Sequence, residues 1–217
     1  MRTGLALITA LLLAVVPIAA ATEPTGRSAE QINEFYDSGA WNRAIVKQVK
    51  KAKAYLKQRT NARNAPRKPA LVLDIDETAL DNYPCFVARG GIPYNSGINA
   101  QCVTAYDAPA VKPVLSLFNR ARDLGVRVFF ITGRPEQIRD GSLDNLRAAG
   151  YTGKYELFMR PAVYEKESAI PAKRASRRAI TRRGFKILAN VGDQQSDLKG
   201  GFSERTYKLP NPIYVTP

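Results

Sequence analysis

Histidine is absent from this chain of 217 residues. Its absence excludes Ser-His-Asp hydrolysis, Cys-His proteolysis, phosphohistidine chemistry and His-ligated zinc. Any hydrolytic chemistry must therefore use carboxylates, lysine, hydroxyl groups or a hard metal ion. Acidic residues are also in deficit, since 19 Asp and Glu stand against 33 Lys and Arg and leave a formal net charge of +14. Such a charge attracts phosphate esters, nucleic acids and acidic polymers, and it does not indicate which of them the protein binds.

Long apolar runs are missing except at the N-terminus. Residues 1–21 have a basic start at Arg2 and then an uncharged stretch that ends in Ala20 and Ala21. The pattern is typical of a secretory signal peptide cleaved after Ala21, or after Ala20, and it predicts export to a periplasm or to the outside of the cell. The alternative is an uncleaved anchor, for which the run is short and is interrupted near its end by Pro17.

Cysteine occurs only twice, at Cys85 and Cys102. An even count in an exported protein indicates a disulfide, which would stabilise the fold by ~3 kcal/mol in the chain-entropy model. Two unpaired, partly buried thiols are the alternative. Neither cysteine stands at the end of the apolar run, so a lipid-modified N-terminal cysteine is excluded.

Residues 22–217 are expected to form one domain that begins with a helical arm over residues 28–60. Ser28 and Gln31 have the spacing of a capping box. In the arm, apolar side chains recur at helical intervals with lysines on the other faces. These apolar residues are Trp41, Ile45, Val49, Ala52 and Leu56.

The rest of the chain alternates apolar strand-like runs with helical patterns. Strands are expected at residues 70–76, 126–132, 154–160 and 185–193, with a short last strand at 206–212, and helices at 112–124, 135–149 and 172–183. The alternation is typical of α/β proteins with a Rossmann-like parallel sheet flanked by helices. Residues 83–109 are rich in Gly, Pro, Asn and Tyr, and are expected to form a small cap insertion over the site.

Acidic side chains follow the first of these strands in LVLDIDETALDN, residues 71–82. Ligands of parallel α/β sheets bind beyond the carboxyl ends of the strands, so the polar residues at the four ends are expected to converge. The residues at those ends are Asp74, Asp76, Thr132, the region after Arg160, and Asp193. This convergence predicts a site that offsets the repulsion between the neighbouring carboxylates.

Paired carboxylates of this kind suit phosphoryl transfer. Asp74 fits a nucleophile that attacks phosphorus, and Asp76 fits the acid that protonates the departing alkoxide and later activates water. Mg²⁺ prefers hard oxygen ligands, and Asp193 and Asp197 in NVGDQQSDL supply further carboxylates. Thr132 can donate a hydrogen bond to a phosphate oxygen.

A lysine is expected to complete the charge balance of the site. Lys173 opens a helical stretch and can reach the phosphate oxygens, while Lys166 competes for the role and a solvated position is the third alternative. The basic run over residues 166–186 indicates either an electrostatic funnel for polyanionic substrates or the outer face of a helix. No aromatic residues are interleaved in it, as platforms for nucleic acid usually require.

The motifs DIDET, ITGR and GDQQSD, with a lysine about twenty residues before the last, together resemble the acid phosphatase branch, subfamily IIIB, of the haloacid dehalogenase (HAD) superfamily. GDQQSDL with RTYKLPNP is more similar to plant acid phosphatases and vegetative storage proteins than to the bacterial class C lipoprotein phosphatases. Class C would have an aromatic residue in place of Leu198 and a tyrosine in place of Cys85.

The resemblance implies an exported, Mg²⁺-dependent acid phosphatase that hydrolyses small phosphate monoesters, with nucleoside monophosphates as one candidate, through an aspartyl-phosphate. It implies Asp74 as nucleophile and Asp76 as general acid/base. It also implies Thr132 with Gly133 as phosphate binders and Lys173 as charge stabiliser. The residues implied around Mg²⁺ are Asp74, Asp76 (through its carbonyl), Asp193 and Asp197. The alternatives are a non-catalytic basic storage or polyanion-binding protein of the same fold, and phosphoryl transfer to an acceptor alcohol. No specific nucleic acid and no membrane span after signal cleavage are expected, and oligomeric state is not indicated.

Overall fold

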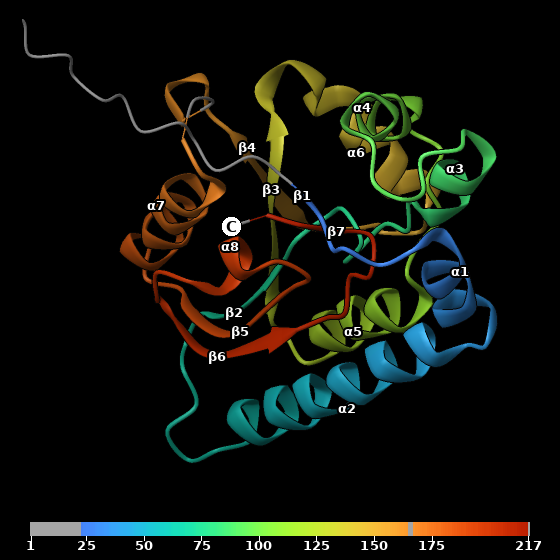
Figure 1. Cartoon of the computed structure of the whole chain (residues 1–217). Helices are drawn as coiled ribbons and strands as arrows, with labels where there is room; N and C mark the ends of the chain where they lie inside the picture. Colours follow the sequence, from blue (N-terminus) through green and yellow to red (C-terminus); the bar gives the residue numbers. More distant parts are fainter. Residues whose placement is uncertain (1–22, 165–166, 217) are drawn as a thin grey trace, which may run out of the picture.

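A five-stranded parallel sheet forms the centre of the computed structural model, which describes residues 23–164 and 167–216 (Figure 1). The strands lie in the order β4-β3-β2-β5-β6, and each neighbouring pair is parallel. Their bounds are β2 Pro69–Leu73, β3 Arg127–Pro135, β4 Tyr155–Arg160, β5 Lys186–Gly192 and β6 Ser203–Lys208. The predicted α/β fold class is confirmed. The predicted signal peptide and Lys166 lie outside the described residues.

Helices surround this sheet, and a two-stranded antiparallel pair joins the ends of the described chain. The helices are α1 Ala29–Asp37, α2 Ala40–Thr60, α3 Tyr83–Ala88, α4 Ser96–Ala105, α5 Lys112–Asp123, α6 Arg139–Ala148, α7 Ala169–Arg182 and α8 Gln195–Leu198. The small pair is β1 Glu23–Pro24 with β7 Tyr214–Val215. Single 3-10 turns precede α6, at Glu136–Ile138, and α7, at Ala162–Tyr164. The predicted helix over 135–149 thus begins as a 3-10 turn.

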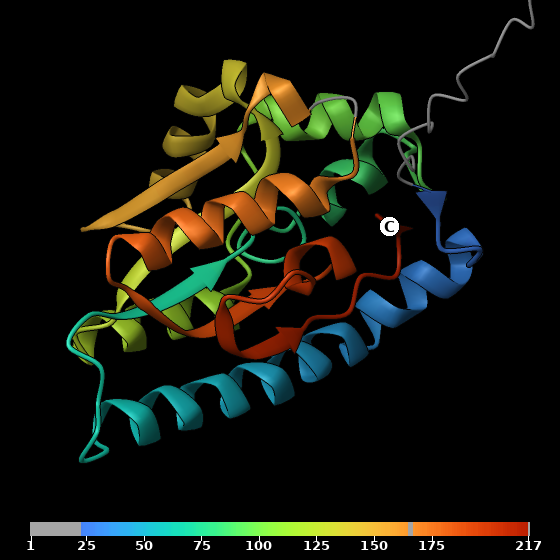
Figure 2. The same cartoon turned by 90° about the vertical axis from the view of Figure 1, so that its left-hand side faces the viewer.

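The sheet separates two apolar layers because successive side chains of a strand point to opposite faces. Leu71 and Leu73 pack in the layer of α2 and α5, whereas Val72 packs with Ile180 of α7. Helix α7 therefore covers one face, and α2 with α5 covers the other (Figure 2). Each fully buried aliphatic side chain contributes roughly 1.5–3 kcal/mol to such a core.

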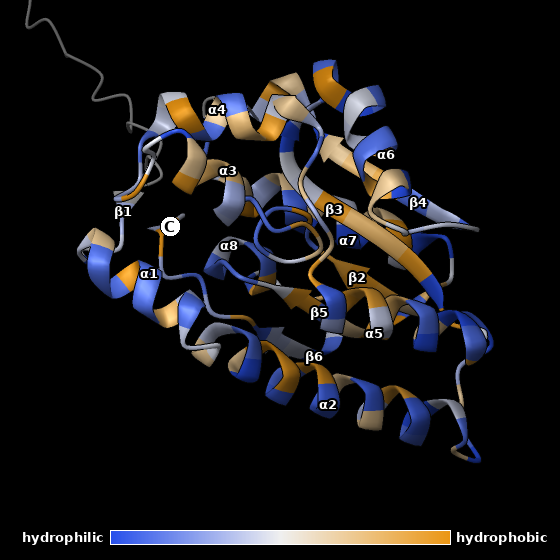
Figure 3. Ribbon diagram, turned by 90° about the vertical axis from the view of Figure 1, so that its right-hand side faces the viewer, coloured by the Kyte–Doolittle hydropathy of each residue, from blue (hydrophilic) through white to orange (hydrophobic). Residues whose placement is uncertain are grey.

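Helix α2 buries the apolar stripe predicted from its sequence, and its lysines are exposed or half-buried. Hydrophobic and hydrophilic residues alternate along its ribbon (Figure 3). It starts after Gly39, whose φ of 72° is in the left-handed region and turns the chain between α1 and α2. The predicted capping box at the start of α1 is also present, with Ser28 accepting the N–H of Gln31. The capping box and the helical spacing of apolar residues therefore predicted the two helices of this arm.

The last strand lies earlier than the sequence suggested. Residues 206–212 were expected, but β6 ends at Lys208 because Pro210 and Pro212 have no N–H to donate to a ladder. Leu209 makes one further bond, from its N–H to the Gly192 carbonyl at 2.8 Å, and the chain then leaves the sheet. It passes over the carboxyl ends of the strands, where Tyr214 lines the cavity described below.

The insertion at residues 83–109 forms α3 and α4, which the sequence did not indicate as helices. The predicted disulfide between Cys85 and Cys102 joins the two helices. The C-terminal end of α4 is held by Tyr106, whose ring packs so closely on Gly141 of α6 that a Cβ there would lie 2.3 Å from the ring. Helix α4 is thereby fixed above the carboxyl ends of the strands.

Candidate active site

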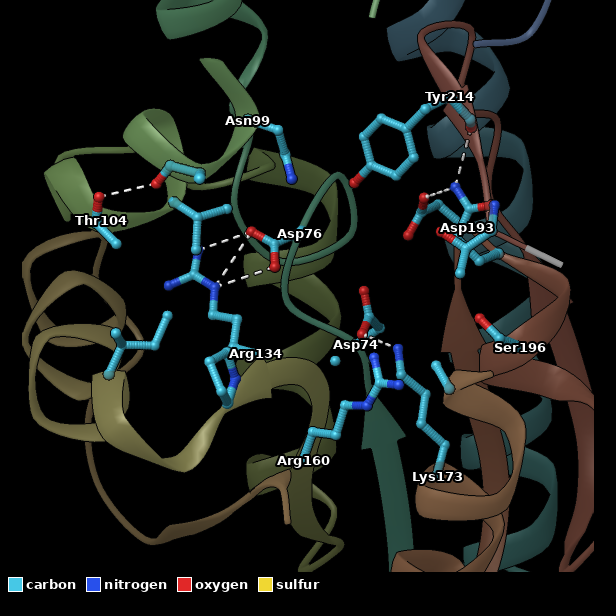
Figure 4. A pocket seen from close by; sticks show the side chains of 18 residues that line it. Asp74, Asp76, Asn99, Thr104, Arg134, Arg160, Lys173, Asp193, Ser196 and Tyr214 are labelled. Atoms are coloured by element: carbon cyan, nitrogen blue, oxygen red, sulfur yellow. Dashed lines mark hydrogen bonds and ion pairs between the residues drawn. The ribbon is translucent and has the colours of Figure 1, made fainter. Parts of the chain in front are cut away.

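A cavity of about 360 Å³ lies at the carboxyl ends of β2, β3, β4 and β5 (Figure 4). The sequence-predicted residues that line it are Asp74, Asp76, Gly133, Lys173 and Asp193. Helix α4 and the C-terminal segment form its other walls. The convergence expected from the ends of parallel strands is therefore present.

Asp74 sits at the base of the cavity, directly after β2. Its N–H donates to the Val191 carbonyl at 3.0 Å, so the turn is attached to β5. Lys173 Nζ lies 2.6 Å from Asp74 Oδ1 and also contacts Asp197. Burial and the Asp197 charge raise the pKa of Asp74 well above its usual value, against the opposing effect of Lys173. Burial would lower the pKa of Lys173, but the two carboxylates outweigh it and raise this pKa.

Three carboxylates in this cluster have the arrangement of a metal site. Asp74, Asp193 and Asp197 are buried, and one oxygen of each lies within 4.8 Å of the others. Burial and the charge of Asp197 raise the pKa of Asp193 to about 6. With all three carboxylates ionised, Lys173 would balance only one of the three charges, so a hard divalent cation fits both the remaining charge and the oxygen donors. The side chain of Asp76 lies outside this group.

Asp193 is oriented by neighbours that the sequence had not singled out. Thr78 Oγ1 donates to Asp193 Oδ1 at 2.9 Å, and Asn211 Nδ2 donates to Oδ2 at 2.9 Å. Gln194 Nε2 donates to the same Oδ2 at 2.6 Å, and Lys208 contacts the main-chain carbonyl. Such outer contacts fix the direction of a ligating carboxylate.

Asp76 stands across the cavity from Lys173 and is held by Arg134. The Nη2 of Arg134 lies 2.7 Å from Asp76 Oδ1, its Nε lies 3.0 Å from Oδ2, and Asn82 Nδ2 donates to Oδ1 at 2.9 Å. Burial would raise the pKa of Asp76, but Arg134 and Asn82 outweigh it and lower the pKa. Arg134 belongs to the ITGR motif, which was the available signal for a role that sequence reasoning missed.

Thr132 and Asp197 occupy places beneath the cavity. Thr132 is 2% exposed, its Oγ1 accepts the N–H of Arg134 at 3.1 Å, and it is absent from the described residues that line the cavity. Gly133, its neighbour, does line it. Asp197 Oδ2 accepts the N–H of Gln194 at 2.7 Å and so orders the turn before α8. A contact from Thr132 to phosphate stays a prediction.

Further lining residues come from segments without a recognisable motif. Helix α4 contributes Asn99 and Thr104, and the C-terminal segment contributes Tyr214. The Tyr214 hydroxyl contacts Glu77, a fully buried carboxyl whose pKa is raised well above its usual value by burial and by the charges of Asp76 and Asp193. No pattern in the sequence connects Tyr214 with residues so far back in the chain.

Residues 13–217 match the profile of a family described as HAD superfamily, subfamily IIIB (Acid phosphatase). The chain is 36% identical to Acid phosphatase 1 of Solanum lycopersicum over 66% of its length and 57% of that relative. It is 28% identical to Vegetative storage protein 1 of Arabidopsis thaliana over 67% of its length and 55% of that relative. The chain thus spans little more than half of these relatives. The class C acid phosphatase from Bacillus anthracis superposes with a TM-score of 0.69 at 22% identity, over 86% of this chain and 85% of that one, and shares the fold.

Proposed function

Because the chain belongs to subfamily IIIB of the HAD superfamily, we propose that it is a Mg²⁺-dependent acid phosphatase of phosphate monoesters. The observation that carries this proposal is the convergence of Asp74, Lys173 and Asp193 in one cavity, with Asp76 on its opposite side. A nucleophile, a charge stabiliser, a metal-ligating carboxylate and an acid/base are the groups that phosphoryl transfer through a covalent intermediate requires.

In the first step an oxygen of Asp74 attacks phosphorus, and the bond from phosphorus to the leaving oxygen breaks as Asp76 protonates that oxygen. In the second step Asp76 takes a proton from water, the water oxygen attacks phosphorus, and the aspartyl-phosphate bond to Asp74 breaks. Lys173 stabilises negative charge beside Asp74 in both steps. Mg²⁺ held by Asp74, Asp193 and the main-chain carbonyl of Asp76 would neutralise charge on the phosphate oxygens.

Asp76 has to carry a proton at the start of this cycle. The ion pair with Arg134 favours the carboxylate of Asp76, which suits the activation of water in the second step and opposes protonation in the first. The rate of the first step is therefore expected to rise toward acidic pH, until protonation of Asp74, whose pKa is raised, removes the nucleophile. A rate that stays constant from about pH 5 to about pH 9 would contradict this assignment.

The decisive experiment is hydrolysis of p-nitrophenyl phosphate at about pH 5.5 with Mg²⁺, with EDTA, and with Asp74→Asn. We expect metal-dependent turnover that the substitution reduces by at least about 10³-fold, because the covalent step then has no nucleophile. Asp144→Asn is the matched control, since the Asp144 side chain is 72% exposed on α6. The proposal would be contradicted if the wild-type protein showed no turnover, or if Asp74→Asn kept the wild-type rate.

Storage or polyanion binding without catalysis is the second candidate, favoured by the similarity to Vegetative storage protein 1 and by the net charge of +14. It predicts binding of polyanions without hydrolysis and indifference to Asp74→Asn. The same assay separates the two candidates.

Export completes the proposal. The N-terminal run over residues 1–21 supports a cleaved signal peptide, and a disulfide between Cys85 and Cys102 suits an oxidising compartment. Within residues 23–164 and 167–216, no helix has the length and apolarity needed to cross a bilayer. Mass spectrometry of the exported protein should find Thr22, or Ala21, at its N-terminus, and an intact N-terminus in the membrane fraction would contradict cleavage.

A further inference from the structure

A second concave surface, of about 530 Å³, follows the outer face of α7. We call it the α7 groove; its charged and aromatic lining residues are Tyr164, Arg174, Arg178, Arg182 and Arg183. None of the described residues that line it is acidic, and the sequence of α7 contains no Asp or Glu. The groove therefore concentrates positive charge, and its described lining supplies no carboxylate.

Two of these arginines have side-chain N–H groups that make no hydrogen bond to the described residues. Arg178 and Arg182 are exposed, and among the described residues neither side chain has a hydrogen bond or an ion pair. Arg177, on the buried side of the same helix, donates to three main-chain carbonyls. Arg183 is paired with Glu156 at 2.7 Å. The free donors are thus confined to the solvent side of α7.

The spacing of the row points to a ligand with several charges in a line. Arg174, Arg178 and Arg182 follow one another at intervals of four residues, which places successive Cα atoms about 6 Å apart along the helix axis. Like charges at this spacing destabilise a helix. A linear polyanion would neutralise all three guanidinium groups at once, whereas a single phosphate would not reach them all.

The α7 groove starts beside the catalytic cavity. Arg160 lines the cavity and points toward Asp74 from the end of β4 (Figure 4), and its Nε donates to the Tyr164 carbonyl at 3.1 Å. Tyr164 in turn lines the groove. Helix α7 belongs to both, with Lys173 in the cavity and Arg174 in the groove. A chain that leaves the cavity past Arg160 would enter the arginine row.

We propose that the α7 groove binds a linear chain of phosphate groups, and that a phosphate monoester at the end of such a chain is a substrate of the cavity. The second half of this statement rests on the proposed function, and the first half does not. Because α7 has no aromatic residue between these arginines, and Tyr164 is the one aromatic side chain among the described residues that line the groove, the chain is read mainly through its phosphates and not through bases. Single-stranded nucleic acid and inorganic polyphosphate share this chemistry.

Binding is tested first, in the Asp74→Asn background, where turnover is blocked. The probe is a fluorescein-labelled oligothymidylate with a 5′-phosphate, followed by anisotropy at several salt concentrations. We expect Arg178→Gln/Arg182→Gln to raise Kd about tenfold at low salt. It should also flatten the slope of log K against log salt by about 1.4, since each phosphate contact in a single strand contributes roughly 0.7.

The matched control is Lys50→Gln/Lys57→Gln, which removes two exposed charges from α2 on the opposite face of the sheet. Equal effects of the two double variants would overturn the proposal, because only total charge would then matter. Unlabelled inorganic polyphosphate is expected to compete with the oligonucleotide. Failure to compete would show that sugars or bases are read, and would also overturn it.

Two further measurements separate this proposal from the phosphatase assignment and from a membrane role. On p-nitrophenyl phosphate, Arg178→Gln/Arg182→Gln should keep the wild-type kcat/KM, whereas on the 5′-phosphorylated oligonucleotide its kcat/KM should fall about tenfold. A variant equal to wild type on both substrates overturns the substrate half alone. If the protein bound phosphatidylglycerol vesicles through Arg178 and Arg182 and did not bind the oligonucleotide, the ligand of the groove would be an anionic lipid surface. That result would overturn the proposal of a phosphate chain.

Discussion

Arg134 is 3% exposed, and all three of its guanidinium nitrogens have partners, since Nε and Nη2 hold Asp76 and Nη1 donates to Ser142 at 3.0 Å. We predict that Arg134→Gln lowers kcat/KM for a phosphate monoester by about 10- to 100-fold, because an Asp76 that is displaced by ~1 Å no longer meets the leaving oxygen. Steady-state kinetics checks the value. Arg147→Gln, which breaks the exposed pair with Asp144, is the control and should leave both activity and stability nearly unchanged.

The carboxyl of Asp81 gives a prediction for pH. Burial raises its pKa to about 6, against the effect of the Tyr83 N–H that it accepts. In the unfolded chain the pKa is about 4, so between these values the folded state binds the proton more tightly, and stability contributed by Asp81 falls as pH rises from about 4 to about 6. Above that range the ionised, partly buried group costs roughly 1–3 kcal/mol.

Asp81→Asn should therefore stabilise the protein at pH 8 and have little effect at pH 4, because the amide still accepts the Tyr83 N–H. Urea unfolding at the two pH values measures the free energy of unfolding of the variant and of the wild type. Because both proteins contain every other titrating group, the difference between their free energies at each pH reports on Asp81. A gain in stability that is the same at both pH values would show that burial of the Asp81 charge is not its cause.

Among the elements, α3 and α4 depend most on a covalent link. The disulfide closes a separation of 17 residues, and in the chain-entropy model its loss costs about 3 kcal/mol. We predict that Cys85→Ala/Cys102→Ala lowers Tm by about 6–12 °C, since 1 kcal/mol corresponds to about 2–4 °C in a domain of this size. Calorimetry with and without dithiothreitol tests it, and reductant should lower the Tm of wild type while leaving the double variant unchanged.

An element was predicted well when the pattern of its own residues indicates it, and poorly when contacts with residues elsewhere in the chain hold it in place. Helix α2 was predicted because Ile45, Val49 and Leu56 repeat with the period of the helix itself. Helix α4 was not, since its sequence is nearly as apolar on one side as on the other. Packing against Gly141 through Tyr106 and the bond to Cys85 hold it instead, and both partners are distant in the chain.

At the scale of the whole molecule, a cluster of three buried carboxylates, Asp74, Asp193 and Asp197, lies within a protein whose net charge is +14. We predict that Mg²⁺ raises Tm, because binding to the folded state alone contributes about 2.7 kcal/mol at a concentration of 100 Kd, or about 5–11 °C. Asp193→Asn should abolish the rise, while Asp81→Asn should keep it. A Tm of wild type that does not respond to Mg²⁺, at concentrations that support activity, would remove the three-carboxylate cluster as the metal site.

The sequence by itself determined the parallel sheet and the places of Asp74, Asp76 and Asp193, and it left Lys173 as one of two candidate lysines. Apolar periodicity sets which elements form, and parallel strands bring their carboxyl ends to one edge of the sheet. Only the tertiary structure decided that Arg134 pairs with Asp76, that Thr78 and Asn211 orient Asp193, and that Tyr214 lines the cavity. These contacts depend on side-chain directions and on packing between distant segments, which no local pattern of residues encodes.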